Sequence, residues 1–133
     1  MKILVIDDEI AALTKMKVLL VPFGECVLST NSAQALELCE NAIAQGDYFE
    51  LISIDIHLKD EDGNKLLEKI MALETREQAK PAKKIMVTAM GTAENLVLAH
   101  ARGCDAFLVK PVKRDALTQK MASLGFTPKG QAA

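Results

Sequence analysis

The chain has 133 residues, half of them hydrophobic, so we expect one domain with a buried core and no second domain of ordinary size. Its formal net charge of −2 gives no general electrostatic reason to expect direct binding to nucleic acid or to an anionic membrane. No apolar run approaches the roughly 18 residues that span a bilayer, and the N-terminus lacks the features of a secretory signal.

In chain order, short apolar runs alternate with segments of helical spacing. The runs are brief and continuous, as expected for strands buried on both faces of a parallel sheet. They cover residues 3–6, 26–28 (the weakest), 51–54, 85–87 and 107–109. Apolar residues recur at helical spacing between and after these runs, over residues 10–20, 35–43, 66–73, 96–101 and 116–124.

Turn and capping residues separate these segments. Pro22 to Gly24 should end the first helix, Asn31 or Ser32 can cap the second, and Asp62-Gly63 forms a turn before the third. Such an alternation implies a parallel sheet with right-handed crossovers. We therefore expect a doubly wound (βα)5 domain over residues 1–124, followed by a short loose tail over 125–133 and no effector domain.

Polar residues follow four of the apolar runs directly. Asp7 and Asp8 follow the first run, Asp55 the third, Thr88 the fourth and Lys110 the fifth. In open α/β sheets, ligands bind outside the carboxyl ends of the strands, where the strand order reverses. A flavodoxin-like order 2-1-3-4-5 makes the first and third strands neighbours, so the three aspartates should lie side by side, flanked by the threonine and the lysine.

This combination of side chains indicates phosphoryl chemistry with a metal ion. Three close carboxylates repel one another unless a cation is present, and an all-oxygen site with a phosphate ligand suits Mg2+. Lys110 could reach a phosphoryl oxygen, and the Thr88 hydroxyl could donate a hydrogen bond to it. A carboxylate is a plausible phosphoryl acceptor, and the metal and the lysine would offset the developing charge.

Five segments together resemble the signature set of response-regulator receiver domains of two-component signal transduction. They are Ile6-Asp7-Asp8-Glu9, Ser53-Ile54-Asp55, Asp62-Gly63, Val87-Thr88-Ala89 and Val109-Lys110-Pro111. The match runs in order from about residue 1 to about residue 124. Each segment is weak by itself, whereas the complete set is highly specific.

The resemblance implies a cytoplasmic phosphorylation switch that catalyses only its own phosphorylation and dephosphorylation. A histidine kinase or a histidine phosphotransfer protein would donate the phosphoryl group to Asp55 in a Mg2+-dependent reaction. The face formed by the fourth helix, the fifth strand and the fifth helix would then change its binding to a downstream protein target, which the sequence does not identify. Such a domain would be a monomer or a phosphorylation-dependent homodimer, and it would contact neither nucleic acid nor a membrane directly.

The resemblance also implies roles for individual residues. Asp7 and Asp8 match the acidic pair that holds Mg2+ together with Asp55 and the main-chain carbonyl of His57. The remaining matches are Thr88 as the switch hydroxyl, Lys110 as the lysine before a cis peptide bond to Pro111, Ala89 as the small residue beside the phosphoryl group, and Phe107 as the switch aromatic residue.

The sequence departs from the family pattern near the acceptor. Many relatives have proline four residues after the acceptor, where this chain has Lys59; we expect a local change in the loop and none in the chemistry. His57 and Met90 occupy positions that tune phosphoryl lifetime in the family. His57 could bias water access, contact a partner or be simply solvated. Phe107 lacks a tyrosine hydroxyl, so its inward or outward choice would rest on packing.

Two other functions remain open. A haloacid-dehalogenase-type phosphatase also uses a strand-end aspartate and Mg2+, but it needs an acid two residues after the nucleophile, where His57 stands, and room for a cap. A degenerate receiver that acts as a constitutive interaction module would have the same fold, although the complete acidic pocket and Lys110 argue against it.

Two further groups are assigned structural roles. The odd number of cysteines and the lack of a C-x-x-C pair argue against disulfides or a zinc site, so we expect Cys26, Cys39 and Cys104 to be small buried hydrophobic residues. A small basic cluster near Arg76 is expected to be a solvated turn; it consists of Lys80, Lys83 and Lys84.

Overall fold

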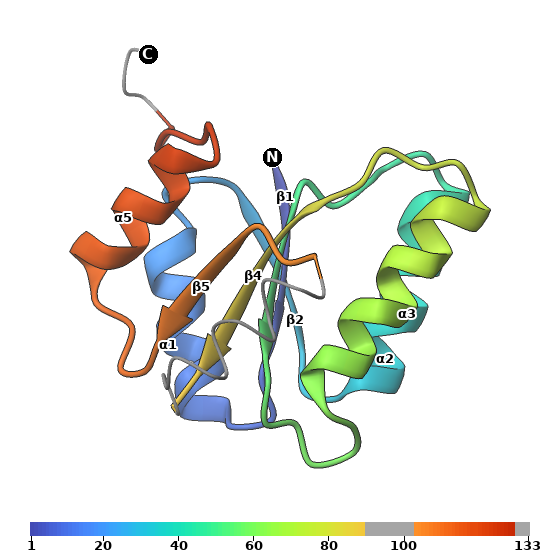
Figure 1. Cartoon of the computed structure of the whole chain (residues 1–133). Coiled ribbons are helices and arrows are strands. Elements are labelled where there is room, and N and C mark those ends of the chain that lie inside the picture. The colour runs from blue at the N-terminus through green and yellow to red at the C-terminus, as the bar shows by residue number, and fades with distance from the viewer. Residues whose placement is uncertain (90–102, 130–133) are drawn as a thin grey trace.

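The computed structural model describes residues 1–89 and 103–129 as a parallel sheet between two layers of helices (Figure 1). In chain order the elements are β1 (Lys2–Ile6), α1 (Ile10–Leu20), β2 (Glu25–Ser29), α2 (Ser32–Ala44), β3 (Leu51–Asp55), α3 (Gly63–Arg76), β4 (Lys83–Thr88), β5 (Ala106–Val109) and α5 (Arg114–Ser123). The predicted helix over 96–101 and Met90 lie outside the described residues.

The sheet has the predicted flavodoxin-like order. Its five parallel strands are arranged β2-β1-β3-β4-β5, so β1 and β3 are hydrogen-bonded neighbours. Helices α1 and α5 lie on one face of the sheet, and α2 and α3 lie on the other (Figure 1). The predicted fold class is therefore confirmed.

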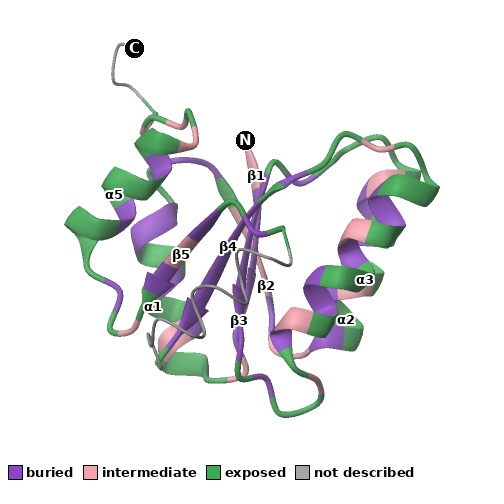
Figure 2. Cartoon of the chain, viewed as in Figure 1, coloured by how far each residue is buried: buried purple, intermediate pink, exposed green. Residues whose placement is uncertain are grey.

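The three central strands β1, β3 and β4 are buried on both faces, which explains their continuous apolar runs (Figure 2). In β1, Leu4 and Ile6 belong to the core cluster that includes α2 and α3, whereas Ile3 and Val5 belong to the cluster that includes α1 and α5. All four side chains are at most 1% exposed. Alternate residues of one strand thus contribute to two cores, because successive side chains point to opposite faces.

Local signals set the helix boundaries. Of the two candidate caps for α2, Asn31 has that role: its Oδ1 accepts a hydrogen bond from the Gln34 N–H at 2.8 Å. Asp62 caps α3 through the Asn64 N–H at 2.9 Å. The next residue must be Gly63, because a Cβ there would lie 2.3 Å from the Asp55 carbonyl oxygen. The close approach of this turn to the end of β3 brings the β3–α3 loop next to the strand ends.

The cysteines and the described part of the tail pack against the domain. Cys39 and Cys104 are buried as predicted, and Cys26 is half-buried. Burial raises the pKa of the Cys39 thiol to about 12.

In the described part of the tail, Phe126 packs against the core on the α1 and α5 side, and the Lys129 N–H donates to the Pro22 carbonyl at 2.7 Å. Among the described helices, none is long and apolar enough to traverse a bilayer.

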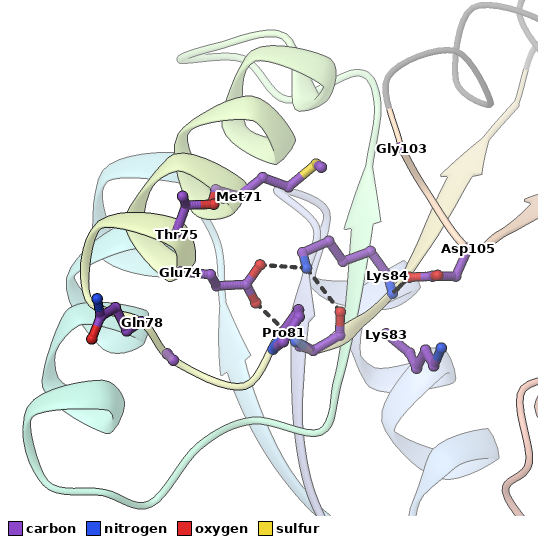
Figure 3. A pocket seen from close by; sticks show the side chains of 11 residues that line it. Met71, Glu74, Thr75, Gln78, Pro81, Lys83, Lys84, Gly103 and Asp105 are labelled. Atoms are coloured by element: carbon purple, nitrogen blue, oxygen red, sulfur yellow. Dashed lines mark hydrogen bonds and ion pairs between the residues drawn. The ribbon is translucent and has the colours of Figure 1, made fainter.

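The predicted solvated basic turn is wrong for Lys84, which is only 3% exposed. Its Nζ donates to Glu74 Oε1 at 2.6 Å and to the Ala82 carbonyl at 2.8 Å (Figure 3). Glu74 Oε2 in turn accepts the Ala82 N–H at 2.8 Å. Lys80 and Lys83 are exposed, as expected. Lys84 is buried because β4 enters the sheet at this point, and Glu74 of α3 neutralises its charge.

Candidate metal and phosphoryl site

Four elements bring the predicted site residues to the carboxyl edge of the sheet. Asp7 follows β1, Asp55 ends β3, Thr88 ends β4 and Lys110 follows β5. Pairing of Ile6 with Ile54 in neighbouring strands places the first two of these residues next to each other. The sequence thus predicted this juxtaposition correctly from the strand ends and the strand order.

Asp7, Asp8 and Asp55 form a compact acidic cluster. Each offers a carboxylate oxygen, and these oxygens all lie within 4.8 Å of one another. Asp7 and Asp55 are 3% and 4% exposed, whereas Asp8 is half-buried. Oxygen donors of this kind and number fit a small, hard divalent cation such as Mg2+ better than a metal that prefers nitrogen or sulfur ligands.

Lys110 provides a positive charge within this cluster. Its Nζ donates to Asp7 Oδ2 at 2.9 Å and to Asp55 Oδ2 at 3.3 Å. Burial opposes the charged lysine, but its bonds to both aspartates and their charges outweigh this and raise the pKa of Lys110. The cluster thus holds three carboxylates but one ammonium group, which pairs with two of them, so it retains an excess of negative charge.

The environment of the cluster perturbs the pKa of Asp55. Burial raises its pKa above the usual aspartate value, and the charge of Asp7 adds to this effect. The His57 N–H, which donates to Asp55 Oδ1 at 3.1 Å, and Lys110 act in the opposite direction. A bound divalent cation would favour the ionised form and thus relieve the repulsion between these carboxylates.

Backbone N–H groups orient all three acids. Besides the His57 bond to Asp55, the Glu9 N–H donates to Asp7 Oδ1 at 3.0 Å. The Lys59 N–H donates to Asp8 Oδ2 at 2.8 Å, although the two residues are 51 positions apart. Lys59 therefore contacts a residue of the acidic cluster, whereas the sequence predicts only a local change in the loop.

His57 connects the β3–α3 loop to the end of β4. Its Nε2 lies 3.1 Å from Thr88 Oγ1, within hydrogen-bonding distance. Thr88 is fully buried, whereas His57 is exposed. Simple solvation, one of the three interpretations of His57 left open by the sequence, therefore does not describe this side chain completely.

The remaining predicted site residues lie around the cluster. Ala89 is exposed and, with Asp7 and Lys110, lines a cavity of about 400 Å3 whose other walls come from α1 and the β5–α5 loop. The peptide bond from Lys110 to Pro111 is cis, as predicted. Phe107 is half-buried and packs against the core on the α2 and α3 side.

Sequence reasoning missed a set of contacts in the β3–α3 loop. The Asp60 carboxylate accepts the Ser32 N–H at 3.2 Å on Oδ1 and 3.0 Å on Oδ2, and the Ser32 hydroxyl donates to Oδ2 at 2.6 Å. Asp60 thus connects the loop to the first residue of α2. The serine at a helix start was a visible signal, but an aspartate 28 positions away was not an obvious partner.

Comparisons with known proteins show the family of the chain. A family model described as "Response regulator receiver domain" matches residues 3–122. The chain is 33% identical over 118 residues to two-component response regulator ORR22 of Oryza sativa subsp. japonica, a match that covers 88% of this chain and 16% of that protein. The chain therefore spans only a small part of the length of that relative.

Solved structures are similar over nearly the whole chain. A CheY-like response regulator receiver domain protein from Methanospirillum hungatei has a TM-score of 0.76 and 33% identity, with 92% of this chain and 91% of that chain covered. The CheX-CheY-BeF3-Mg complex from Borrelia burgdorferi contains a chain with a TM-score of 0.81 and 20% identity, with 95% and 90% covered. The second likeness concerns the fold alone.

Proposed function

Because this chain belongs to the response regulator receiver domain family, we propose that it accepts a phosphoryl group on Asp55 from a histidine kinase or a histidine phosphotransfer protein. The observation that carries this proposal is the acidic cluster, in which three carboxylates lie within 4.8 Å and Lys110 Nζ lies 3.3 Å from Asp55 Oδ2. Such a cluster combines an acceptor, ligands for a cation and a positive charge for phosphoryl oxygens.

In the proposed reaction an Asp55 carboxylate oxygen attacks the phosphorus atom of a phosphohistidine. The new P–O bond forms as the P–N bond of the donor breaks, and the imidazole leaves. The His57 N–H holds Oδ1 of the acceptor at 3.1 Å, and the Lys110 ammonium, freed from Oδ2, offsets charge on the phosphoryl oxygens. Asp7, Asp8, Asp55 and the main-chain carbonyl of His57 would hold Mg2+, which would offset the same charge when bound.

The phosphoryl group would change the contacts of Thr88. Its hydroxyl lies 3.1 Å from His57 Nε2 and would donate instead to a phosphoryl oxygen. Ala89 has only a methyl side chain and would leave room for that oxygen, while Phe107 would adjust its packing. Moving a fully buried residue at the end of β4 would alter the loop that follows it.

This change would alter the face formed by the fourth helix, β5 and α5. The fourth helix lies outside the described residues, and the described part contains Val109, which is 45% exposed. We propose that this face binds a downstream protein in a phosphorylation-dependent way. The chain would act in the cytoplasm, either as a monomer or as a phosphorylation-dependent homodimer. The domain would catalyse only its own phosphorylation and dephosphorylation, without turnover of a small molecule such as p-nitrophenyl phosphate.

Acetyl phosphate provides a direct test in the absence of the cognate donor. With Mg2+ present, the wild-type chain should gain one phosphoryl group, visible as a shifted band on a Phos-tag gel. The band should be absent with EDTA and in Asp55→Asn. Asp47→Asn, which changes an exposed aspartate paired with Lys2, is the matched control and should be phosphorylated like wild type. Equal phosphorylation of Asp55→Asn and wild type would contradict the proposal.

A further inference from the structure

The β3–α3 loop is attached at two adjacent residues, one to α2 and the other to the segment between β1 and α1. Asp60 accepts three hydrogen bonds from Ser32, the buried first residue of α2. Lys59, one position earlier, donates its N–H to Asp8 Oδ2 at 2.8 Å. We call Ser32, Asp60 and the Lys59 N–H the loop clamp, because together they connect α2 to one of the three acids.

The attachment at α2 is a strong one. The Ser32 hydroxyl bond of 2.6 Å is the main cause that lowers the pKa of Asp60, so this carboxylate is ionised at neutral pH. An ionised carboxylate at a helix N-terminus also interacts favourably with the helix dipole and its free N–H groups. Charge-assisted bonds of this kind hold their partners in a narrow range of positions.

The attachment at Asp8 depends on residue 59 having a backbone N–H. Proline has no backbone N–H, so a proline at position 59 would remove this donor. Lys59 therefore supplies a backbone donor that reaches an acid of the cluster. Asp8 is the most exposed of the three acids and would otherwise be the freest to rotate.

We propose that the loop clamp positions Asp8 for cation binding, with Lys59 and Asp60 as positioning residues rather than ligands. The clamp places the Lys59 N–H so that it fixes one oxygen of Asp8, and the carboxylate enters the cluster in one orientation. Mg2+ demands near-ideal ligand geometry, and hydrogen bonds that orient a metal's carboxylate ligands commonly change affinity by about 10- to 100-fold. The inference rests on the Mg2+ site of the proposed function.

The test compares Mg2+ affinities of variants by isothermal titration calorimetry. Lys59→Pro removes the N–H and should weaken Mg2+ binding about tenfold. Lys59→Ala keeps the N–H and removes only the exposed side chain with its positive charge, so it should bind Mg2+ as tightly as wild type or more tightly. Asp60→Ala releases the loop from α2 and should also weaken binding, with Ser32→Ala giving a smaller loss because it removes one of the three bonds.

Circular dichroism and urea unfolding of each variant establish that it is folded. If Lys59→Pro does not fold, Asp60→Ala and Ser32→Ala test the same connection without a change of backbone. The inference is overturned if Asp60→Ala binds Mg2+ as tightly as wild type, or if Lys59→Ala loses as much affinity as Lys59→Pro. Phosphorylation of Asp55 separates the two proposals. If wild type is phosphorylated with Mg2+ but the variants bind Mg2+ with unchanged affinity, the proposed function stands and the loop clamp alone is contradicted.

Discussion

Both ends of the parallel sheet bury charged side chains, but they do so differently. At the amino edge, Lys84 of β4 and Glu74 of α3 form a one-to-one pair at 2.6 Å, and the Ala82 backbone satisfies further hydrogen-bonding groups on both (Figure 3). At the carboxyl edge, three carboxylates cluster together, and Lys110 pairs with two of them, Asp7 and Asp55.

The two edges cannot be distinguished by the size of the cavity beside them. The cavity next to the Glu74–Lys84 pair has about 460 Å3, and the one beside Asp7 and Lys110 has about 400 Å3. What separates them is the balance of charge: the pair at the amino edge is neutral, whereas the acidic cluster has excess negative charge and a raised pKa at Asp55. An imbalance of charge, rather than burial, therefore indicates where a cation and a phosphoryl group could bind.

The largest expected effect is on stability at the amino edge. Lys84→Met leaves Glu74 buried without its partner and should cost about 3–5 kcal/mol in the free energy of unfolding, measured by urea denaturation. The double variant Lys84→Met/Glu74→Leu should recover most of this loss, because no buried charge remains. A loss below about 1 kcal/mol in the single variant would mean that the pair has no structural importance.

Magnesium should stabilise the carboxyl edge. At 100 times its dissociation constant, Mg2+ should add about 2.7 kcal/mol to the free energy of unfolding of wild type. Asp8→Asn removes a ligand charge and should lose most of this gain at the same Mg2+ concentration. Glu74→Gln, at the amino edge, should be less stable overall but keep the Mg2+-dependent gain. Equal gains in Asp8→Asn and wild type would contradict a cation site at the acidic cluster.

Without a metal ion, the charge of Asp55 should reduce stability. Its folded-state pKa is raised by burial, so the folded state holds its proton more tightly than the unfolded state, where the pKa is about 3.9. The contribution of Asp55 to stability is thus most favourable below that value and declines as pH rises through the raised pKa. In EDTA at neutral pH, Asp55→Asn should therefore be more stable than wild type, as measured by thermal unfolding. A less stable Asp55→Asn would contradict this interpretation.

The smallest expected effect concerns the bond between His57 and Thr88. Phosphorylation would replace this bond, so its loss should favour the phosphorylated form by about 1 kcal/mol, or about fivefold. His57→Ala should therefore bind beryllofluoride in the presence of Mg2+ more tightly than wild type, as measured by NMR titration. His57→Gln, which offers an amide as a hydrogen-bonding group, is the control and should lie closer to wild type. Weaker binding by His57→Ala would show that the histidine supports the phosphorylated form instead.

The sequence revealed most of the carboxyl edge because residue type and strand position were both visible there. Asp7, Asp55, Thr88 and Lys110 each stand at the end of an apolar run, and the strand order alone brings them together. The contact of Asp8 with the Lys59 N–H was not predictable in this way. A backbone donor has no signature in residue type, and its position depends on how the loop is attached to α2.

The amino edge shows a signal that was present but misinterpreted. Lys84 stands among other lysines, which favoured a solvated turn. However, Glu74 follows Ile70 by four residues and Leu67 by seven, so it occupies the apolar stripe of α3 and must be buried with that stripe. A buried glutamate requires a cationic or hydrogen-bonding partner, and this requirement was the clue to the buried lysine.

The most direct test of the central claim identifies the residue at the carboxyl edge that receives the phosphoryl group. Wild-type chain is incubated with acetyl phosphate and Mg2+, reduced with borohydride to convert an aspartyl phosphate to homoserine, digested and sequenced by tandem mass spectrometry. We predict homoserine at position 55 and unchanged aspartates at positions 7 and 8. Homoserine at position 7 or 8, or an unchanged Asp55 in phosphorylated protein, would contradict the account.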